Sequence, residues 1–185
     1  MKKSLLALTL LAATPFAASA AEGVSYNYVD GGYVASNLSN GLPDADGWGL
    51  KGSVAIAPNF HIFGDYTSQK FDNINSDIDN WRVGLGYNHE ISQRVDLLTR
   101  VAYERYELPF NNLTGYSAEV GVNSSLTNRV NGYALAGYED TDLYNGEFYG
   151  RLGAQVKFTP NWSASADVKL IDGDTQWFVG PRFTW

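Results

Sequence analysis

The chain ends with Trp177-Phe178-Val179-Gly180-Pro181-Arg182-Phe183-Thr184-Trp185, and this stretch decides its fold. Successive side chains of a β-strand point to opposite faces. One face would carry Trp177, Val179, Pro181, Phe183 and Trp185, and the other Phe178, Gly180, Arg182 and Thr184. An aromatic face opposite a more polar face is typical of a strand that separates lipid from a polar interior. The stretch therefore predicts a transmembrane β-strand.

The first residues of the chain have the three parts of a secretory signal peptide. Lys2 and Lys3 form a basic head, residues 5–13 form an apolar run, and small residues occupy positions 18–20. The apolar run is shorter than the roughly 20 residues that a membrane-spanning helix needs, so we exclude helical spans. We expect cleavage between Ala20 and Ala21, which divides the chain into a signal peptide, 1–20, and one mature domain, 21–185.

Four short polar turns recur every 33 to 35 residues, at Pro58-Asn59, Ser92-Gln93, Thr127-Asn128 and Pro160-Asn161. A repeat of this length indicates a two-strand unit. The other connections, 36–46, 72–80, 108–113, 140–146 and 172–174, are mostly longer and rich in Asp, Asn and Gly. Short turns at one end and long loops at the other are typical of outer-membrane barrels, with periplasmic turns and extracellular loops.

The pattern predicts an all-β fold, a single closed antiparallel transmembrane β-barrel of ten strands, with eight strands as the alternative. The expected strands are 24–35, 47–57, 60–71, 80–89, 95–107, 114–124, 130–139, 147–158, 162–171 and 175–185. The faces of the first and seventh strands stay open, because both of their faces carry apolar and polar residues. A soluble sandwich would show the same alternation, but with its apolar faces turned inward.

The last strand is expected to close the barrel against the first. Val179, Phe183 and Trp185 form the terminal aromatic pattern that we interpret as the signal for the outer-membrane insertion machinery. Pro181 has no backbone N–H, so one bond of the sheet should be missing there or replaced by a bulge.

Ten charged residues are expected to face the interior: Lys51, Asp65, Arg82, Arg100, Glu104, Glu119, Arg151, Lys157, Asp167 and Lys169. Both signs are mixed along the strands. Because unpaired charges are costly inside a narrow barrel, opposite charges should bond across the lumen and fill it. The alternative is a narrow polar path for small solutes or ions.

The mature chain would carry 11 basic and 20 acidic residues, which makes nucleic acid an unsuitable partner. Aromatic residues lie near both ends of the expected strands, where membrane proteins have interfacial belts. We expect a monomer in contact with outer-membrane lipid and lipopolysaccharide, whose loops meet host or cell-surface ligands.

No catalytic residue, cofactor site or metal site is expected. The two histidines, His61 and His89, fall near short turns and are interpreted as polar residues at the barrel end. The chain has no nucleophile elbow, phosphate loop or pair of histidines at metal-ligand spacing. Glu139, Asp140 and Asp142 are interpreted as solvated loop carboxylates.

Three tracts carry a resemblance to a known family: residues 21–34 (AEGVSYNYVDGGYV), 131–139 (NGYALAGYE) and 178–185 (FVGPRFTW). They resemble the small outer-membrane proteins known as sulfation-dependent quorum factor, or activator of rice Xa-twenty-one immunity. The resemblance spans the chain. It implies an outer-membrane barrel shed in vesicles and linked to signalling, motility, biofilm and virulence. It also implies a sulfated tyrosine at Tyr26, a residue that our strand boundaries place inside the first strand.

Overall fold

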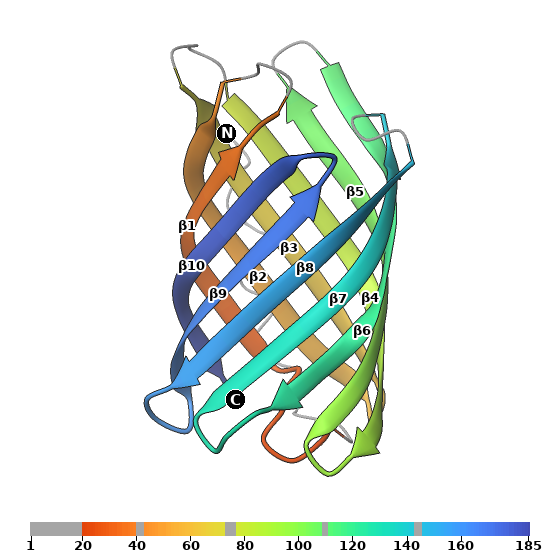
Figure 1. The fold of residues 1–185 in the computed structure, drawn as a ribbon, viewed down its shortest axis with the longest axis vertical. Helices are drawn as coiled ribbons and strands as arrows, with labels where there is room; N and C mark the ends of the chain where they lie inside the picture. Colours follow the sequence, from red (N-terminus) through yellow and green to blue (C-terminus); the bar gives the residue numbers. More distant parts are fainter. Residues whose placement is uncertain (1–19, 40–42, 73–76, 109–110, 143–145) are drawn as a thin grey trace, which may run out of the picture.

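The computed structural model describes residues 20–39, 43–72, 77–108, 111–142 and 146–185. Within them the chain forms one closed barrel of antiparallel strands in the order β1-β10-β9-β8-β7-β6-β5-β4-β3-β2 (Figure 1). The strands are β1 (Tyr28–Asn37), β2 (Ala45–Ala57), β3 (Phe60–Phe71), β4 (Asp77–Ser92), β5 (Val95–Leu108), β6 (Asn111–Ser125), β7 (Val130–Thr141), β8 (Glu147–Lys157), β9 (Trp162–Ile171) and β10 (Asp174–Thr184). None of the described residues forms a helix long and apolar enough to cross a membrane.

The ten-strand prediction is confirmed, and the eight-strand alternative is wrong. Four strands begin earlier than expected: β4 at Asp77 and β6 at Asn111, each by three residues, β2 at Ala45 by two, and β10 at Asp174 by one. The first strand begins later, at Tyr28 instead of residue 24, so the placement of Tyr26 within it is wrong. The proposed signal peptide, apart from Ala20, lies outside the described residues.

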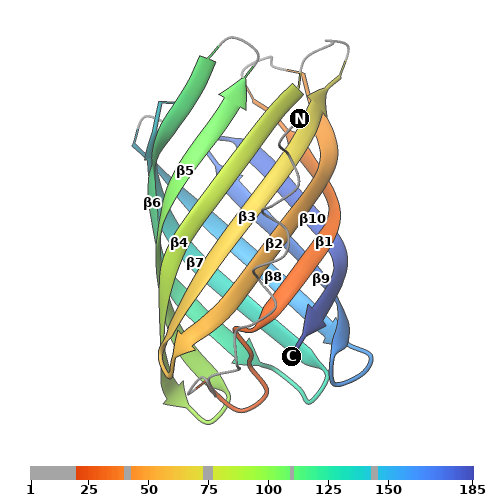
Figure 2. The same ribbon diagram turned by 180° about the vertical axis from the view of Figure 1, so that it is seen from behind.

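Short turns lie at one end of the barrel and longer connections at the other, as Figure 1 and its reverse view in Figure 2 show. The described N-terminal residues and the C-terminal end both lie at the end with the short turns (Figure 2). This arrangement follows from the even number of strands, because each hairpin returns the chain to the end from which it started.

The barrel closes where β1 pairs with β10 along its length. The pairing is interrupted between Asp30, opposite Arg182, and Tyr33, opposite Val179, while the register stays the same on both sides. Pro181 lies in this interval and has no N–H to donate, so the strands lose ladder bonds there without forming a bulge. Of the two outcomes expected at Pro181, a missing sheet bond or a bulge, the structure shows the missing bond.

The outer wall of the barrel is apolar and the inner wall is polar. Large apolar side chains such as Val83, Val101 and Leu152 are exposed on the outside, whereas Arg82, Glu104 and Arg151 are buried inside. A soluble sandwich would show the opposite distribution, so that alternative is wrong. The wall therefore matches a hydrocarbon environment.

The structure decides the two strands whose faces were ambiguous. In β7, Tyr133 and Leu135 line the interior, and Ala134 and Ala136 are exposed. In β1, Tyr28 faces inward together with Asp30, while Val29 and Tyr33 are exposed. Neighbouring strands settle both cases, since an inward face must continue the polar interior.

Exposed aromatic rings gather at both ends of the outer wall. At one end Tyr66 packs between Trp48 and Trp81, with ring centroids 5.2 and 4.3 Å apart. At the end with the short turns Phe183 packs against Trp162, with centroids 5.1 Å apart. Two such clusters separated by aliphatic side chains match the interfacial belts of a membrane barrel.

The close approach of β1 to β10 predicts different effects of alanine at two glycines. A Cβ on Gly32 would overlap the Val179 carbonyl, whereas a Cβ on Gly150 meets no atom within 4 Å. We expect Gly32→Ala to destabilise the barrel by about 1–3 kcal/mol because the strands must separate. Gly150→Ala, the control, should change stability by less than about 0.5 kcal/mol.

Urea titration of the barrel in detergent, with heat-modifiable gel migration reporting the folded fraction, measures both variants. Equal midpoints for Gly32→Ala and the wild-type protein would contradict the close packing of this seam.

Candidate functional site in the barrel interior

Glu119 on β6 is the centre of the charged interior. Its carboxylate, which is 0% exposed, lies 2.6 Å from Arg100 Nη2, 2.9 Å from Arg82 Nη2 and 3.5 Å from Arg151 Nε. Arg100 lies directly opposite Glu119 on the neighbouring strand β5, while the other two arginines reach it from β4 and β8. One carboxylate therefore joins three strands to its own.

Arg82 carries the network further around the barrel. Its Nε lies 3.1 Å from Glu104 Oε1, and its Nη1 lies 3.4 Å from Asp65 Oδ2. Both carboxylates are its direct cross-strand neighbours, Asp65 on β3 and Glu104 on β5. The strand register thus places a cation between two anions and satisfies a guanidinium that would be costly to bury alone.

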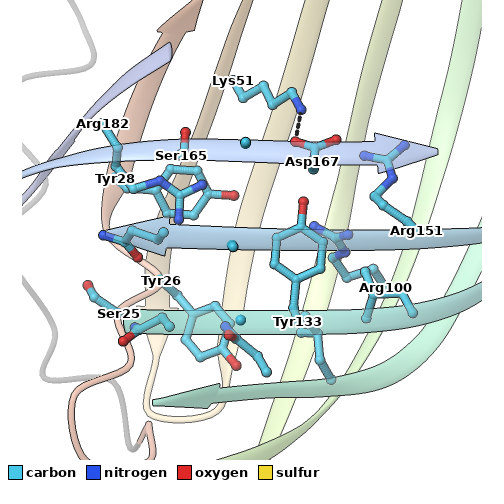
Figure 3. Close-up of a pocket in the computed structure, with 18 of the residues that line it drawn as sticks. Ser25, Tyr26, Tyr28, Lys51, Arg100, Tyr133, Arg151, Ser165, Asp167 and Arg182 are labelled. Atoms are coloured by element: carbon cyan, nitrogen blue, oxygen red, sulfur yellow. Dashed lines mark hydrogen bonds and ion pairs between the residues drawn. The ribbon is translucent and has the colours of Figure 1, made fainter. Parts of the chain in front are cut away.

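Three further ion pairs complete the interior. Lys51 on β2 reaches across the lumen to Asp167 on β9 (Figure 3). Lys169 pairs with Glu139, which also accepts a hydrogen bond of 2.8 Å from the Tyr106 hydroxyl. Arg182 donates two bonds of 2.6 Å to Asp30, and its guanidinium lies 3.9 Å from the centre of the Tyr28 ring.

The ion pairs of the described lumen balance in charge. The cations are Lys51, Arg82, Arg100, Arg151, Lys169 and Arg182, and the anions are Asp30, Asp65, Glu104, Glu119, Glu139 and Asp167. Because there are six positive and six negative side chains, the network as a whole is neutral. Buried ions are tolerated when each is paired and hydrogen-bonded, so the network can fill the lumen.

Aromatic rings packed over glycines fill much of the remaining interior. A Cβ on Gly137 would overlap the ring of Tyr149, and one on Gly153 would overlap the ring of Tyr133. Because glycine has no side chain, Gly137 and Gly153 leave room for the tyrosine rings of the neighbouring strands inside a narrow barrel. Gly137 and Gly153 have this packing role.

Two small cavities remain in the described interior. One, of about 50 Å³, is lined by residues that include Tyr26, Arg100 and Tyr133 (Figure 3). The other, of about 60 Å³, lies toward the long loops and is lined by residues that include Thr67, Tyr106 and Gln176. Each holds a few water molecules at most, since one water needs roughly 10–15 Å³.

Nine of the ten charged residues proposed for the interior take part in these ion pairs, and Lys157 does not. The Lys157 ammonium instead donates to the carbonyl of Gly23, near the short turns. The ten expected interior charges did not include Asp30, Glu139 and Arg182, which also form ion pairs there. Glu139 is fully buried, so its interpretation as a solvated loop carboxylate is wrong. For Arg182 the sequence offered a signal, because Arg182 lies on the same face of the last strand as Gly180 and Thr184, opposite the aromatic face.

The segment before β1 lies inside the barrel at the end with the short turns. Tyr26 is 3% exposed, forms a cluster with Leu98 and Leu135, and donates a 2.9 Å hydrogen bond to Asp96. Its ring stacks on His61, with centroids 4.5 Å apart. Burial raises the pKa of the Tyr26 hydroxyl, and the Asp96 charge raises it further. The segment thus occupies this mouth of the lumen.

The two histidines lie in different environments. His61 is buried against Tyr26, whereas His89 is exposed and stacks on Tyr87. The described residues hold no group of three or more His, Cys, Asp or Glu side chains that could bind a metal ion.

The residues interpreted as the insertion signal lie on the outer wall. Val179 and Trp185 are exposed there, and Trp185 stacks on Phe183.

Comparison with known proteins agrees with this architecture. The family model described as "Outer membrane protein beta-barrel domain" matches residues 4–180. No curated protein matches the chain.

Solved structures are similar to the chain at low sequence identity. The chain is similar to the KdgM porin, with 11% identity, a TM-score of 0.50, and coverage of 85% of this chain and 99% of that one. It is also similar to Ail, the attachment invasion locus protein of Yersinia pestis, with 15% identity, a TM-score of 0.42, and coverage of 87% and 100%.

Removal of the Glu119 charge should destabilise the barrel strongly. In Glu119→Gln, Arg82, Arg100 and Arg151 lose their shared carboxylate, and breaking such a buried pair costs about 3–5 kcal/mol. Glu107→Gln is the matched control, because the pair of Glu107 with Arg105 is about 40% exposed and should contribute less than about 1 kcal/mol. Urea unfolding in detergent compares the two, and equal losses would refute the central role of Glu119.

Proposed function

Because the chain belongs to the outer membrane protein β-barrel family, we propose that it is a structural and surface-interaction barrel whose lumen is closed to solutes. It is a small outer-membrane β-barrel, and such barrels differ in function mainly by what their lumen and loops do. The proposal therefore depends on the contents of the lumen and on the loop end of the barrel.

The observation that carries the proposal is the ion-paired interior, whose network of six cations and six anions is neutral. Glu119 ties β4, β5, β6 and β8 together across the lumen, and Lys51 ties β2 to β9. The cavities beside these pairs measure about 50 and 60 Å³, far less than a hydrated ion and its path would require. An interior of this kind favours rigidity of the wall over passage.

The loop end supports a role in surface contact. Ser39 donates from its backbone to Asp174, at 2.6 Å, and from its hydroxyl to the Asp172 carbonyl, at 3.2 Å. Across the rim, Thr114 donates from its backbone to Asp142, at 3.1 Å. These bonds hold polar loop residues in place above the wall. We propose that this rim meets lipopolysaccharide and host or cell-surface ligands, and that the barrel works as a monomer.

A narrow channel is the second candidate. One observation favours it: polar cavities lie on both sides of the layer formed by Lys51, Asp65 and Arg151, which lines both. Movement of these three side chains would join the cavities into a polar path. The proposal of a closed lumen requires that they stay paired.

The resemblance to sulfation-dependent quorum factor adds finer proposals. We propose that the barrel is released in outer-membrane vesicles and contributes to motility, biofilm and virulence. Sulfation of Tyr26 does not fit the folded barrel, because the hydroxyl is buried and a sulfate would bring a second negative charge against Asp96.

Planar-bilayer recordings test the closed lumen. We expect no steady current steps from the wild-type protein, because the ion pairs block the path. Flotation with liposomes and heat-modifiable migration verify that the protein has inserted and folded. Steady steps whose ion selectivity changes in Arg100→Ala would support the channel instead, since Arg100 lies in the blocking network.

Mass spectrometry of vesicle protein tests the state of Tyr26. We expect the peptide that carries Tyr26 to have its unmodified mass, since the folded barrel shields the hydroxyl from a sulfotransferase. Tyr33, which is exposed on the outer wall, serves as an internal reference for a tyrosine outside the lumen. A sulfated Tyr26 in folded barrels would contradict the expectation.

A further inference from the structure

Asp96 differs from the other buried lumen carboxylates in its partners. It lies near the start of β5 and is 0% exposed. Its Oδ1 accepts a 2.9 Å bond from the backbone nitrogen of Ala21, and its Oδ2 accepts a 2.9 Å bond from the Tyr26 hydroxyl. Both oxygens therefore act as acceptors, as they do in an ionised carboxylate.

The ion pairs of the described residues do not include Asp96. The six cations and six anions of the network balance one another and leave Asp96 as a seventh carboxylate. An ionised carboxylate taken out of water needs a cation close by. The atom already in place for that role is the backbone nitrogen of Ala21, the residue expected to begin the mature chain.

We propose that Asp96 is the binding site for the α-ammonium group of Ala21, which forms when the signal peptide is removed. Hydrolysis of the Ala20–Ala21 peptide bond consumes one water and leaves a carboxylate on Ala20 and an ammonium on Ala21. An amide hydrogen bond to Asp96 thereby becomes a charge-assisted one, and the seventh carboxylate gains its cation. Processing of the chain thereby gives Asp96 a cation within hydrogen-bond distance.

The residues after Ala21 hold this nitrogen in place. Glu22 donates from its backbone to the Gln93 carbonyl, at 2.7 Å, and Val24 donates to the Ala21 carbonyl, at 3.0 Å. The Gly23 carbonyl accepts a 2.8 Å bond from the Asn131 side chain, and Gly23 has φ of +82°, which favours glycine. The segment is thus fixed from the β4–β5 turn and from β7, so little entropy is lost when the ammonium meets Asp96.

The consequence is a plug whose stability depends on processing. Residues 21–27 cover the mouth at the short turns, and the Asn27 side chain accepts a 2.8 Å bond from the Ala55 backbone. An N-terminus trimmed at another residue would place its charge elsewhere and leave Asp96 without its cation. The position of the cleavage is therefore a structural requirement of the closed mouth.

The pKa of the α-amine is the readout that separates an ion pair from simple packing. Burial alone lowers the pKa of an amine, whereas a paired carboxylate raises it. Protein made with its own signal peptide is extracted from outer membranes, and the mass of its N-terminal peptide identifies the first residue. Trace acetylation across a pH series then gives the pKa of the Ala21 amine, in the folded barrel and in urea.

We expect an N-terminus at Ala21 and a folded-state pKa at least one unit above that in urea, where about 7.7–8.0 is ordinary. Asp96→Asn should remove the increase because it keeps the shape and loses the charge. Tyr26→Phe is the matched control, since it loses the other hydrogen bond to Asp96 but keeps the carboxylate, and its amine should stay elevated.

A different N-terminus, an equal or lower pKa in the folded barrel, or an elevated pKa that persists in Asp96→Asn would overturn the proposal. The comparison of folded and unfolded wild-type protein decides the matter even if Asp96→Asn does not fold. Current steps in planar bilayers would refute the closed lumen and leave this result untouched, so the two proposals fail separately.

Discussion

The pairing of β1 with β10 is the constraint on which the rest of the structure depends. In hydrocarbon every backbone donor and acceptor must be satisfied within the protein, and a sheet achieves this by closing on itself. Gly32 and Gly180 allow the two strands to approach, and the seam tolerates Pro181 by losing ladder bonds without changing register. Closure by ten strands then fixes the width of the lumen.

A lumen of this width cannot stay empty, and its contents follow from the strand register. Cross-strand neighbours such as Arg82 with Glu104 and Arg100 with Glu119 face each other because the ladder aligns them. A buried charge is tolerated only when it is paired with one of opposite sign, so charge balance depends on the strands of the whole barrel. The same pairs that stabilise the wall also block passage, which links the packing of the interior to a function at the surface.

Much of this could be predicted from the sequence. The alternation of apolar and polar residues, the evenly spaced short turns and the aromatic end of the chain predicted the number and order of the strands. Nine of the ten proposed interior charges lie in the ion-paired network because a period of two fixes their face. Glu139 was misjudged because it was grouped with the loop carboxylates Asp140 and Asp142, whereas it lies in β7 and pairs with Lys169. Lys157 bonds the Gly23 carbonyl, a partner from the segment before β1 that only the folded barrel brings close.

The sequence by itself determined the wall, because the side-chain period of a strand is local and each strand carries its own apolar face. The contents of the lumen were decided only by the tertiary structure. Tyr26 continues the alternation of β1, yet it leaves the strand because Leu98, Leu135 and Asp96 form a site for it inside the barrel. Sites of this kind exist only after closure brings β5 and β7 around the segment, and no local pattern records them.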